Sequence, residues 1–221
     1  MQFYRTACLA LCESGDFDKF KSIYEEERVC FSGGISDNSG LLAVCLLHDV
    51  QSIFTFLLQR STLADLGALH EAYKVPLLLH ASIVLHRNTM FQELYSFGLG
   101  IDNPYVVVKC CHIAIQSCNW LLLETLLRDS HCDLGPESVS ADLLFSAANS
   151  LHAPSVLLLL QAIRSRHSAD YVKHCINMVT PKGLTILNVL MLLVRICERD
   201  PTTACNTNPL SHQLLSYAQS F

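Results

Sequence analysis

Charged side chains are scarce in this chain, and their scarcity excludes some kinds of protein. Only 16% of the 221 residues are charged, against roughly 25% in an ordinary globular domain. A disordered chain needs high charge and low hydrophobicity, whereas 51% of this chain is apolar. We therefore expect a chain that is ordered throughout. Its excess apolar surface is then available to a partner, or to neighbouring parts of a longer protein.

A run of basic side chains is also missing. The formal net charge is −5, and the Lys and Arg residues are scattered, as at Arg164 and Arg166. Proteins that bind the phosphates of DNA or RNA need clustered cations. We therefore do not expect nucleic acid to be a direct partner.

Long apolar runs are absent as well. A membrane-spanning helix needs about 18 or more consecutive apolar residues, and the longest candidate, Leu41–Leu58, is interrupted by His48 and Asp49. The uncharged stretch between Arg5 and Glu13 is too short for the core of a secretory signal. The 11 cysteines are an odd number and fall within apolar stretches, as buried thiols do in a reducing compartment. We expect a soluble, intracellular protein of the cytoplasm or nucleus, not bound to a membrane.

The common catalytic motifs are missing too. The chain has no Gly-x-Ser-x-Gly, no Gly-rich phosphate loop and no His-Glu-x-x-His. The carboxylates of Glu25–Glu27 are expected at a solvated helix end rather than in an acid/base pair. We expect no enzyme, no catalytic residues and no cofactor.

Cysteine and histidine are abundant enough to raise a metal hypothesis. The densest groups are Cys110–His112, His131–Cys132 and His174–Cys175. Structural zinc sites use paired ligands at Cys-x2-4-Cys or His-x3-5-His spacing, which these groups lack. We therefore assign no metal ligands. A metal-binding or redox-sensing module built from these groups remains the alternative function.

What the chain does have is a pattern that returns at roughly 33-residue intervals, the signature of a repeat protein. The copies align on a turn expected at Gly15, His48, His86, Cys118, Leu151 and Val194. In the five full copies, apolar residues lie seven positions before the turn and five, eight and nine positions after it. The last three positions fall on one face of a helix. Each copy is therefore predicted to be a pair of antiparallel helices.

The pattern predicts an all-α solenoid of stacked helix pairs, which forms a single domain over 1–221. The expected repeats are 5–38, 39–74, 75–106, 107–138, 139–180 and 181–221. The expected helices are 5–13 and 16–27, 40–47 and 50–59, 77–85 and 88–97, 109–117 and 120–128, and 142–150 and 154–164. Longer spacings place insertions with helical patterning at Ser61–Tyr73 and Arg164–Pro181. In the last copy Pro201 ends the helix, so Glu198–Asn208 is expected as a loop before a helix at Pro209–Gln219.

These copies resemble the ankyrin repeat. The residues that carry the resemblance are Leu79-His80, Phe97–Asp102, His112, Ala114, Ala147-Ala148 and Gly183–Asn188. The resemblance implies a helix-pair solenoid that binds other proteins, in which the rings of His80 and His112 hydrogen-bond to the turn backbone. A solenoid of the TPR or HEAT type is the architectural rival, and the 32–33 residue spacings and Leu-His openings favour ankyrin.

In ankyrin stacks the residues just before the turn line the concave face and are commonly polar or small. Glu13, Gln116 and Asn149 follow that rule in their copies, whereas the second and third copies have Leu46-Leu47 and Val84-Leu85. We therefore predict an apolar anchor that binds a peptide or helical segment of another protein, as in a scaffold or adaptor. The predicted partner-binding residues are Leu46, Leu47, Val84, Leu85, Gln116, Trp120 and Asn149. The alternative is that the Ser61–Tyr73 insertion covers the four apolar ones.

Overall fold

The structure is a computed structural model, and it describes residues 2–30, 38–100, 103–129, 132–150 and 152–178, with residues 185, 186, 188 and 191 beyond them. In this part of the chain twelve α-helices follow one another, and an antiparallel bridge joins Leu69 to Pro76. The expected all-α class is therefore confirmed. The expected sixth repeat lies almost wholly outside the described residues.

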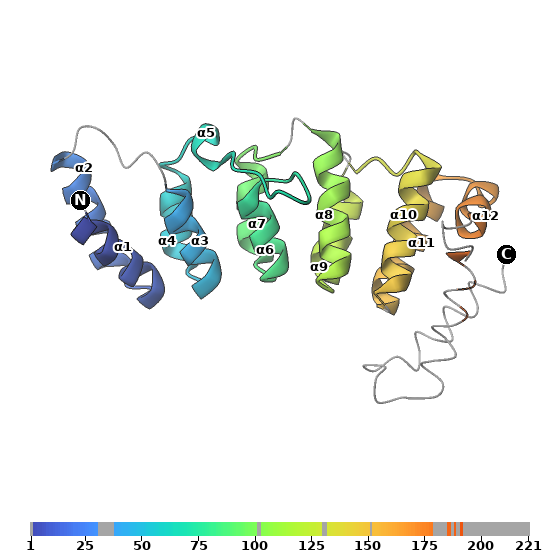
Figure 1. Ribbon diagram of the computed structural model, residues 1–221, viewed down its shortest axis with the longest axis horizontal. Coiled ribbons are helices and arrows are strands. Elements are labelled where there is room, and N and C mark those ends of the chain that lie inside the picture. Colours follow the sequence, from blue (N-terminus) through green and yellow to red (C-terminus); the bar gives the residue numbers. More distant parts are fainter. Residues whose placement is uncertain are drawn as a thin grey trace, which may run out of the picture. The chain divides into compact units, whose positions relative to one another are not determined.

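The helices come in pairs that match the predicted ones closely (Figure 1). They are α1 (Gln2–Ser14), α2 (Phe17–Cys30), α3 (Ser39–His48), α4 (Gln51–Leu58), α5 (Leu63–Leu66), α6 (Leu77–Val84), α7 (Asn88–Ser96), α8 (Pro104–Gln116), α9 (Trp120–Arg128), α10 (Glu137–Asn149), α11 (Ala153–Arg166) and α12 (Ala169–Asn177). The two short extra helices, α5 and α12, lie in the two stretches where insertions were expected. Among the described residues, no helix is long and apolar enough to cross a membrane.

A residue with left-handed backbone ends the first helix of each of the first four pairs. The φ angles are 73° at Gly15, 62° at Asp49, 58° at His86 and 56° at Cys118. Three of these are the predicted turn positions, and in the second pair the turn is at Asp49 rather than His48. The next helix begins two residues later in every case. The turns expected at Leu151 and Val194 lie outside the described residues.

The same hydrogen bond closes three of these turns. The amide after the left-handed residue donates to the carbonyl five positions earlier, from Val50 to Cys45 at 3.0 Å, from Arg87 to Ser82 at 2.8 Å and from Asn119 to Ala114 at 2.8 Å. This is the bond of a Schellman motif, which needs one left-handed residue and satisfies a carbonyl at the helix end. The repeated turn therefore sets a common register for the helix pairs.

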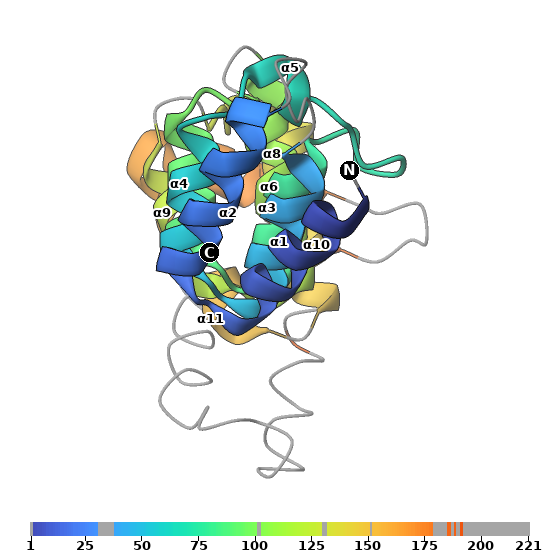
Figure 2. The same cartoon turned by 90° about the vertical axis from the view of Figure 1, so that its left-hand side faces the viewer.

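The described helices divide into two compact units, Met1–Val106 and Val107–Phe221. The division coincides with the expected boundary between the third and fourth repeats, 75–106 and 107–138, and it runs through α8. In unit 1, α1 packs on α3 and α3 on α6, while α2 packs on α4 and α4 on α7. Figure 2 looks along this unit, with α1, α3 and α6 on one side and α2 and α4 on the other. Unit 1 is therefore a two-layer stack of helix pairs.

Aromatic rings pack between α2 and α4 in unit 1. The rings of Phe20 and Tyr24 are stacked 5.6 Å apart, and Phe56 meets both of them edge-on. The Tyr24 hydroxyl donates to Asn38 Oδ1 at 3.2 Å, and Asn38 Nδ2 donates to Ser61 Oγ at 3.1 Å. Asn38 and Ser61 are buried, so their hydrogen bonds also satisfy polar groups that would be costly to leave unpaired. These bonds connect α2 to the start of α3 and the end of α4.

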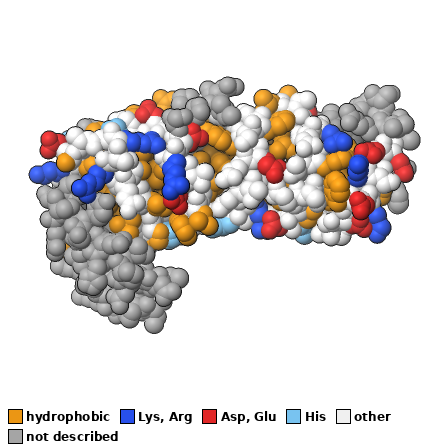
Figure 3. All heavy atoms as spheres, turned by 180° about the vertical axis from the view of Figure 1, so that it is seen from behind, with side chains coloured by type: hydrophobic (Ala, Val, Ile, Leu, Met, Phe, Trp, Pro, Cys, Tyr) orange, Lys and Arg blue, Asp and Glu red, His pale blue; other side chains and the backbone are white. Residues whose placement is uncertain are grey.

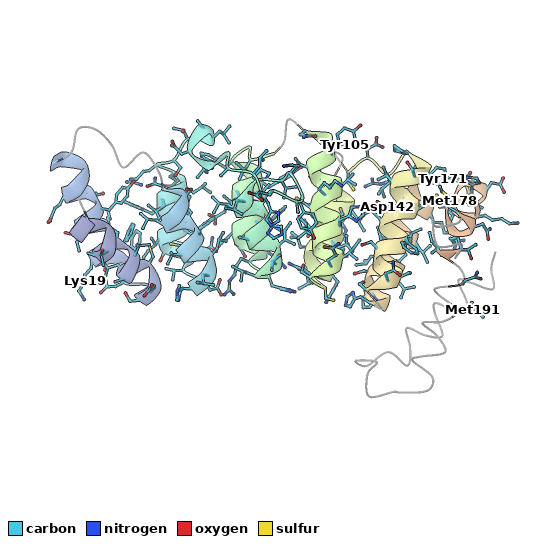
Figure 4. The ribbon with its side chains drawn as sticks, in the orientation of Figure 1. Lys19, Tyr105, Asp142, Tyr171, Met178 and Met191 are labelled. Carbon is cyan, nitrogen blue, oxygen red and sulfur yellow. The ribbon has the colours of Figure 1, made fainter. Side chains whose placement is uncertain are left out.

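In unit 2, α10 packs on α11 and α12, and α9 packs on α11. The side chain of Arg166, the last residue of α11, donates to the carbonyls of Leu127 and Cys132. The hydroxyl of Tyr171 on α12 (Figure 4) donates to the carbonyls of Leu134 and Gly135, at 2.8 and 2.9 Å. These two side chains therefore hold the segment that connects α9 to α10.

Candidate functional site

The exposed side of the first helices in unit 1 forms one nearly uncharged face. Its positions lie nine, six, five and two residues before the left-handed turn residue, and these offsets share one helical stripe. We call this the first-helix face. It consists of Thr6, Leu9, Ala10 and Glu13 on α1, Gly40, Ala43, Val44 and Leu47 on α3, and Leu77, His80, Ala81 and Val84 on α6. Glu13 is the one residue on it that carries a formal charge at neutral pH.

The buried positions of the same helices explain why this face is exposed. On α3 the buried residues are Leu41, Leu42, Cys45 and Leu46, and on α6 they are Leu78, Leu79, Ser82 and Ile83. These stripes pack in the core, and the first-helix face lies on the opposite side of each helix. The helices α3 and α6 are therefore apolar on both sides, and Leu47, Leu77 and Val84 on the outer side are exposed.

The structure divides the predicted anchor residues into two groups. Leu47 is 57% exposed and Val84 is 45% exposed, and both lie two residues before their turn. Leu85 is half-buried. Leu46 is 0% exposed, so its assignment to the binding surface was wrong. It belongs to the core because it lies on the α3 stripe that faces the rest of the unit.

The Ser61–Tyr73 insertion does not cover the two exposed anchors. The side chain of Leu63, at the start of α5, lies beside Gly98, where an added Cβ would be 3.7 Å from Leu63 Cδ1. Gly98 follows the end of α7, whereas Leu47 and Val84 lie at the turn ends of α3 and α6. The exposed fractions of Leu47 and Val84 are measured with the insertion in place. The covering hypothesis is therefore wrong for these two side chains.

Arg87 ties the two anchor-bearing turns together. Its Nε donates to the carbonyl of Leu46 at 3.0 Å and its Nη2 to that of Leu47 at 3.4 Å. Its Nη1 also lies 3.0 Å from Asp49 Oδ2. A cation at the end of α3 satisfies the free carbonyls there and interacts favourably with the helix dipole. Arg87 thus fixes the carboxyl ends of α3 and α6 relative to each other.

The opposite side of unit 1 has a different character. The residues Asp18, Lys19, Lys21, Glu25 and Glu26 of α2 are all exposed. Charged side chains of both signs are interspersed there with other residue types (Figure 3). Unit 1 therefore has a nearly uncharged face on one side and a face with charges of both signs on the other. The low charge of the first-helix face is thus a local feature, and the low charge content of the whole chain does not explain it.

The corresponding positions in unit 2 are polar. Lys109 and Gln116 of α8 and Asp142 and Asn149 of α10 are exposed, and Asp142 is labelled in Figure 4. Trp120, at the start of α9, is 43% exposed. The predicted residues Gln116, Trp120 and Asn149 are therefore accessible, as a binding role requires. They lie in unit 2, whereas the anchors lie in unit 1.

The two histidines that carry the ankyrin resemblance contact other side chains. The ring of His80 stacks on His70 with centroids 4.0 Å apart, and Tyr73 lies 5.3 Å from both rings. His112 Nε2 lies 3.4 Å from Asp142 Oδ2. The sequence did not predict the His70–Tyr73–His80 stack, because these rings meet only when the insertion folds against α6.

Burial disfavours the charged form of three histidines. It is the main reason that the pKa of His80 is lowered, and the neighbouring His70 lowers it further. Burial also lowers the pKa of His152. At His112 the carboxylate of Asp142 acts in the opposite direction, but burial is the larger effect, so the pKa is lowered there too.

We expect the protein to lose stability as the pH falls through the ordinary histidine range. The unfolded chain binds protons at a pKa near 6.5, whereas the folded chain binds them at His80, His112 and His152 only at lower pH. The unfolded state therefore binds more protons below that pKa, and the free energy of unfolding falls. Urea unfolding followed by circular dichroism should give a lower midpoint at pH 5.5 than at pH 7.5. The difference should shrink in a His152→Gln variant, and equal midpoints in the wild type would contradict the prediction.

The cysteines of the described residues are mainly buried, as the sequence predicted. Cys8 and Cys12 of α1 are both core residues, and Cys118 in the turn before α9 is the exposed thiol of the described set. Within that same set no three His, Cys, Asp or Glu side chains are placed to hold a metal ion together. His131, one of the residues of the metal hypothesis, lies outside it.

Comparison of the chain with protein families, with curated proteins and with solved structures found no match.

Proposed function

We propose that this chain is a non-catalytic protein-interaction module, a solenoid of ankyrin-type repeats that acts as a scaffold or adaptor. The observation that supports the proposal best is the exposure of Leu47 and Val84 at equivalent turn positions on two packed helices. They lie in a face with one charged residue, and contiguous apolar surface of this kind marks binding sites. The ligand is a peptide or helix of another protein that places apolar side chains against these two residues.

The charge of unit 1 narrows the chemistry of that ligand. Residues 1–106 contain 7 Lys and Arg and 12 Asp and Glu, a net charge of −5, while residues 107–221 contain 8 of each. All of the net negative charge therefore belongs to the half of the sequence with the apolar anchor. Complementary charge speeds association and selects partners. We propose an apolar segment with flanking Lys or Arg residues as the preferred ligand.

The exposed residues of unit 2 are proposed as a second contact region. Gln116, Trp120 and Asn149 are polar or amphipathic and accessible. Exposed Trp side chains are enriched at interfaces because they combine a large apolar ring with a hydrogen-bond donor. This region would make polar contacts of its own, separately from the apolar anchor in unit 1.

The test is selection of a phage-displayed random peptide library on the full chain. We expect enriched peptides with apolar residues at helical spacing and basic flanks. Leu47→Glu combined with Val84→Glu should weaken their binding at least about 100-fold, because it buries unpaired carboxylates at a cost of about 3 kcal/mol or more.

Leu121→Glu is the matched control, since Leu121 is 53% exposed on α9 in unit 2. It introduces one carboxylate on a leucine that is about as exposed as Leu47, and it should weaken binding far less than either single substitution in the anchor. Circular dichroism of all variants should remain that of the wild type, because exposed substitutions usually change stability by less than about 0.5 kcal/mol. Peptides that bind the folded double variant as tightly as the wild type would refute the proposed anchor.

A further inference from the structure

Two buried cysteines of unit 2 lie side by side although 20 residues separate them in the sequence. Cys111 is in the middle of α8, and Cys132 is in the segment that connects α9 to α10. Their Sγ atoms are 3.9 Å apart. A disulfide requires about 2.0 Å, so the two thiols are reduced but close enough to be bridged by a small movement.

The side chain of an arginine hydrogen-bonds to the backbone of one of these two cysteines. Arg166 Nη1 donates to the carbonyl oxygen of Cys132 at 2.6 Å, and its Nη2 lies 3.5 Å from the carbonyl of Asp129. A nearby guanidinium favours a thiolate, which is the reactive form of cysteine. The connecting segment is further held by Tyr171, whose hydroxyl donates to the carbonyls of Leu134 and Gly135.

The electrostatics differ between the two thiols. The hydrogen bond shared with Cys111 lowers the pKa of Cys132, and the charge of Arg166 lowers it further, while burial opposes them. The same hydrogen bond and burial raise the pKa of Cys111. Cys132 is thus suited to attack an oxidant, and Cys111 is suited to keep its proton until the second step.

We propose that Cys111 and Cys132 form a dithiol switch that hydrogen peroxide closes to a disulfide. Both thiols are buried, and hydrogen peroxide is a much smaller oxidant than a disulfide such as oxidised glutathione. This assignment does not depend on the proposed apolar anchor, which lies in unit 1.

The reaction balances in two steps. The Cys132 thiolate attacks one oxygen of hydrogen peroxide, the O–O bond breaks, and the products are a sulfenic acid and hydroxide. Cys111 then loses its proton and attacks the Cys132 sulfur, and the S–O bond breaks to release the sulfenic oxygen as water. The two thiols lose two electrons in total, and the peroxide is reduced to two molecules of water.

Closing the bond changes unit 2 in two ways. It cross-links α8 to the segment before α10 and closes a chain loop of about 20 residues, which restricts the unfolded state. It also draws Cys132 toward α8, away from the position at which Arg166 holds its carbonyl. We therefore expect the oxidised chain to unfold at a higher temperature, by about 5–10 °C.

The experiment treats the full chain with hydrogen peroxide, blocks free thiols with iodoacetamide and maps disulfides by mass spectrometry. The expected result is a Cys111–Cys132 cross-linked peptide together with the rise in melting temperature. In a Cys111→Ser variant, unfolding the peroxide-treated chain in the presence of dimedone should label Cys132 as a sulfenic acid. Arg166→Met should slow the cross-linking at least about fivefold, and Arg166→Lys should slow it less because the charge is kept.

The chain offers two internal references. Cys118 is exposed and should be oxidised without forming this bridge. Cys12 and Cys45 are also buried and share a thiol hydrogen bond, but no cation contributes to the pKa of Cys45 as Arg166 does to that of Cys132, so this pair should be oxidised more slowly at the same dose. Oxidation of both pairs at equal rates, or full oxidation of Cys118 while Cys111 and Cys132 stay reduced, would overturn the proposal.

Discussion

Leu46→Ala is expected to lower the free energy of unfolding by about 2–5 kcal/mol, whereas Leu47→Ala should change it by no more than about 0.5 kcal/mol. The two leucines are neighbours on α3, yet Leu46 is 0% exposed and Leu47 is 57% exposed. Removing the Leu46 side chain leaves a cavity in the core between α3 and its neighbours. Removing the Leu47 side chain takes atoms from the surface, where water replaces them.

Urea unfolding of both variants beside the wild type measures the two free energies. Both variants replace a leucine with alanine at neighbouring positions of α3, so the change in helix propensity is the same in the two. A second readout separates structure from function, since Leu47→Ala should weaken peptide capture while it leaves the melting temperature unchanged. Equal destabilisation by the two substitutions would contradict the orientation of α3.

Gly100→Ala is expected to cost about 2–4 kcal/mol of unfolding free energy. Gly100 has a φ of 84°, and an added Cβ would lie 2.8 Å from Val106 Cγ1 and 3.5 Å from Leu79 Cδ1. A left-handed conformation costs a residue with a Cβ about 1–2 kcal/mol, and overpacking of a core adds about 1–3 kcal/mol. Val106 and Leu79 are both buried, so neither side chain can move aside into solvent.

Gly67→Ala is the matched control for this second variant. Gly67 has a φ of −75°, and the nearest atom to an added Cβ is the Leu63 carbonyl oxygen at 3.5 Å. Alanine fits there, so the variant should be neutral or slightly more stable, because alanine reduces the entropy of the unfolded chain. Thermal unfolding of both variants tests the pair. A Gly100→Ala variant as stable as Gly67→Ala would contradict the tight packing of the segment that joins α7 to α8.

Sequence periodicity was sufficient to find the helix pairs, because a short unit with a buried stripe repeats the same apolar spacing. It placed the turn correctly at Gly15, His86 and Cys118 and one residue early in the second pair. There the left-handed position is occupied by Asp49, a residue type that tolerates this conformation better than most. In this chain the apolar pattern located each of these turns to within one residue. Which residue of the turn is left-handed is a property of the folded backbone.

Helix starts were less well predicted than helix ends. The first helices of the fourth and fifth pairs were expected at 109 and 142, but α8 begins at Pro104 and α10 at Glu137, directly after Pro136. Proline is common at the first turn of a helix because its missing N–H has no helical partner there. Pro104 and Pro136 therefore mark these helix starts, which the spacing of the apolar residues alone places too late.

The candidate site was only partly predictable. The run Leu41–Leu47 is apolar on every side of its helix, so periodicity alone does not tell which of the adjacent leucines faces the core. The packing of α3 between α1 and α6 decides it, and places Leu46 inside and Leu47 outside. The sequence correctly indicated an apolar surface near these two turns, because polar residues hold the equivalent positions in the first, fourth and fifth copies.

The sequence by itself determined the helical class, the number and register of the described helix pairs, and the low charge of the first-helix face. These properties depend on residues close together in the chain, where spacing and side-chain type are enough. Tertiary structure alone decided which leucine is exposed, where the Ser61–Tyr73 insertion packs, and which cysteines meet. The Sγ atoms of Cys111 and Cys132 are 3.9 Å apart only because the segment after α9 folds back on α8 and is held there by Arg166. No local pattern encodes such a contact, since it depends on the packing of several helices at once.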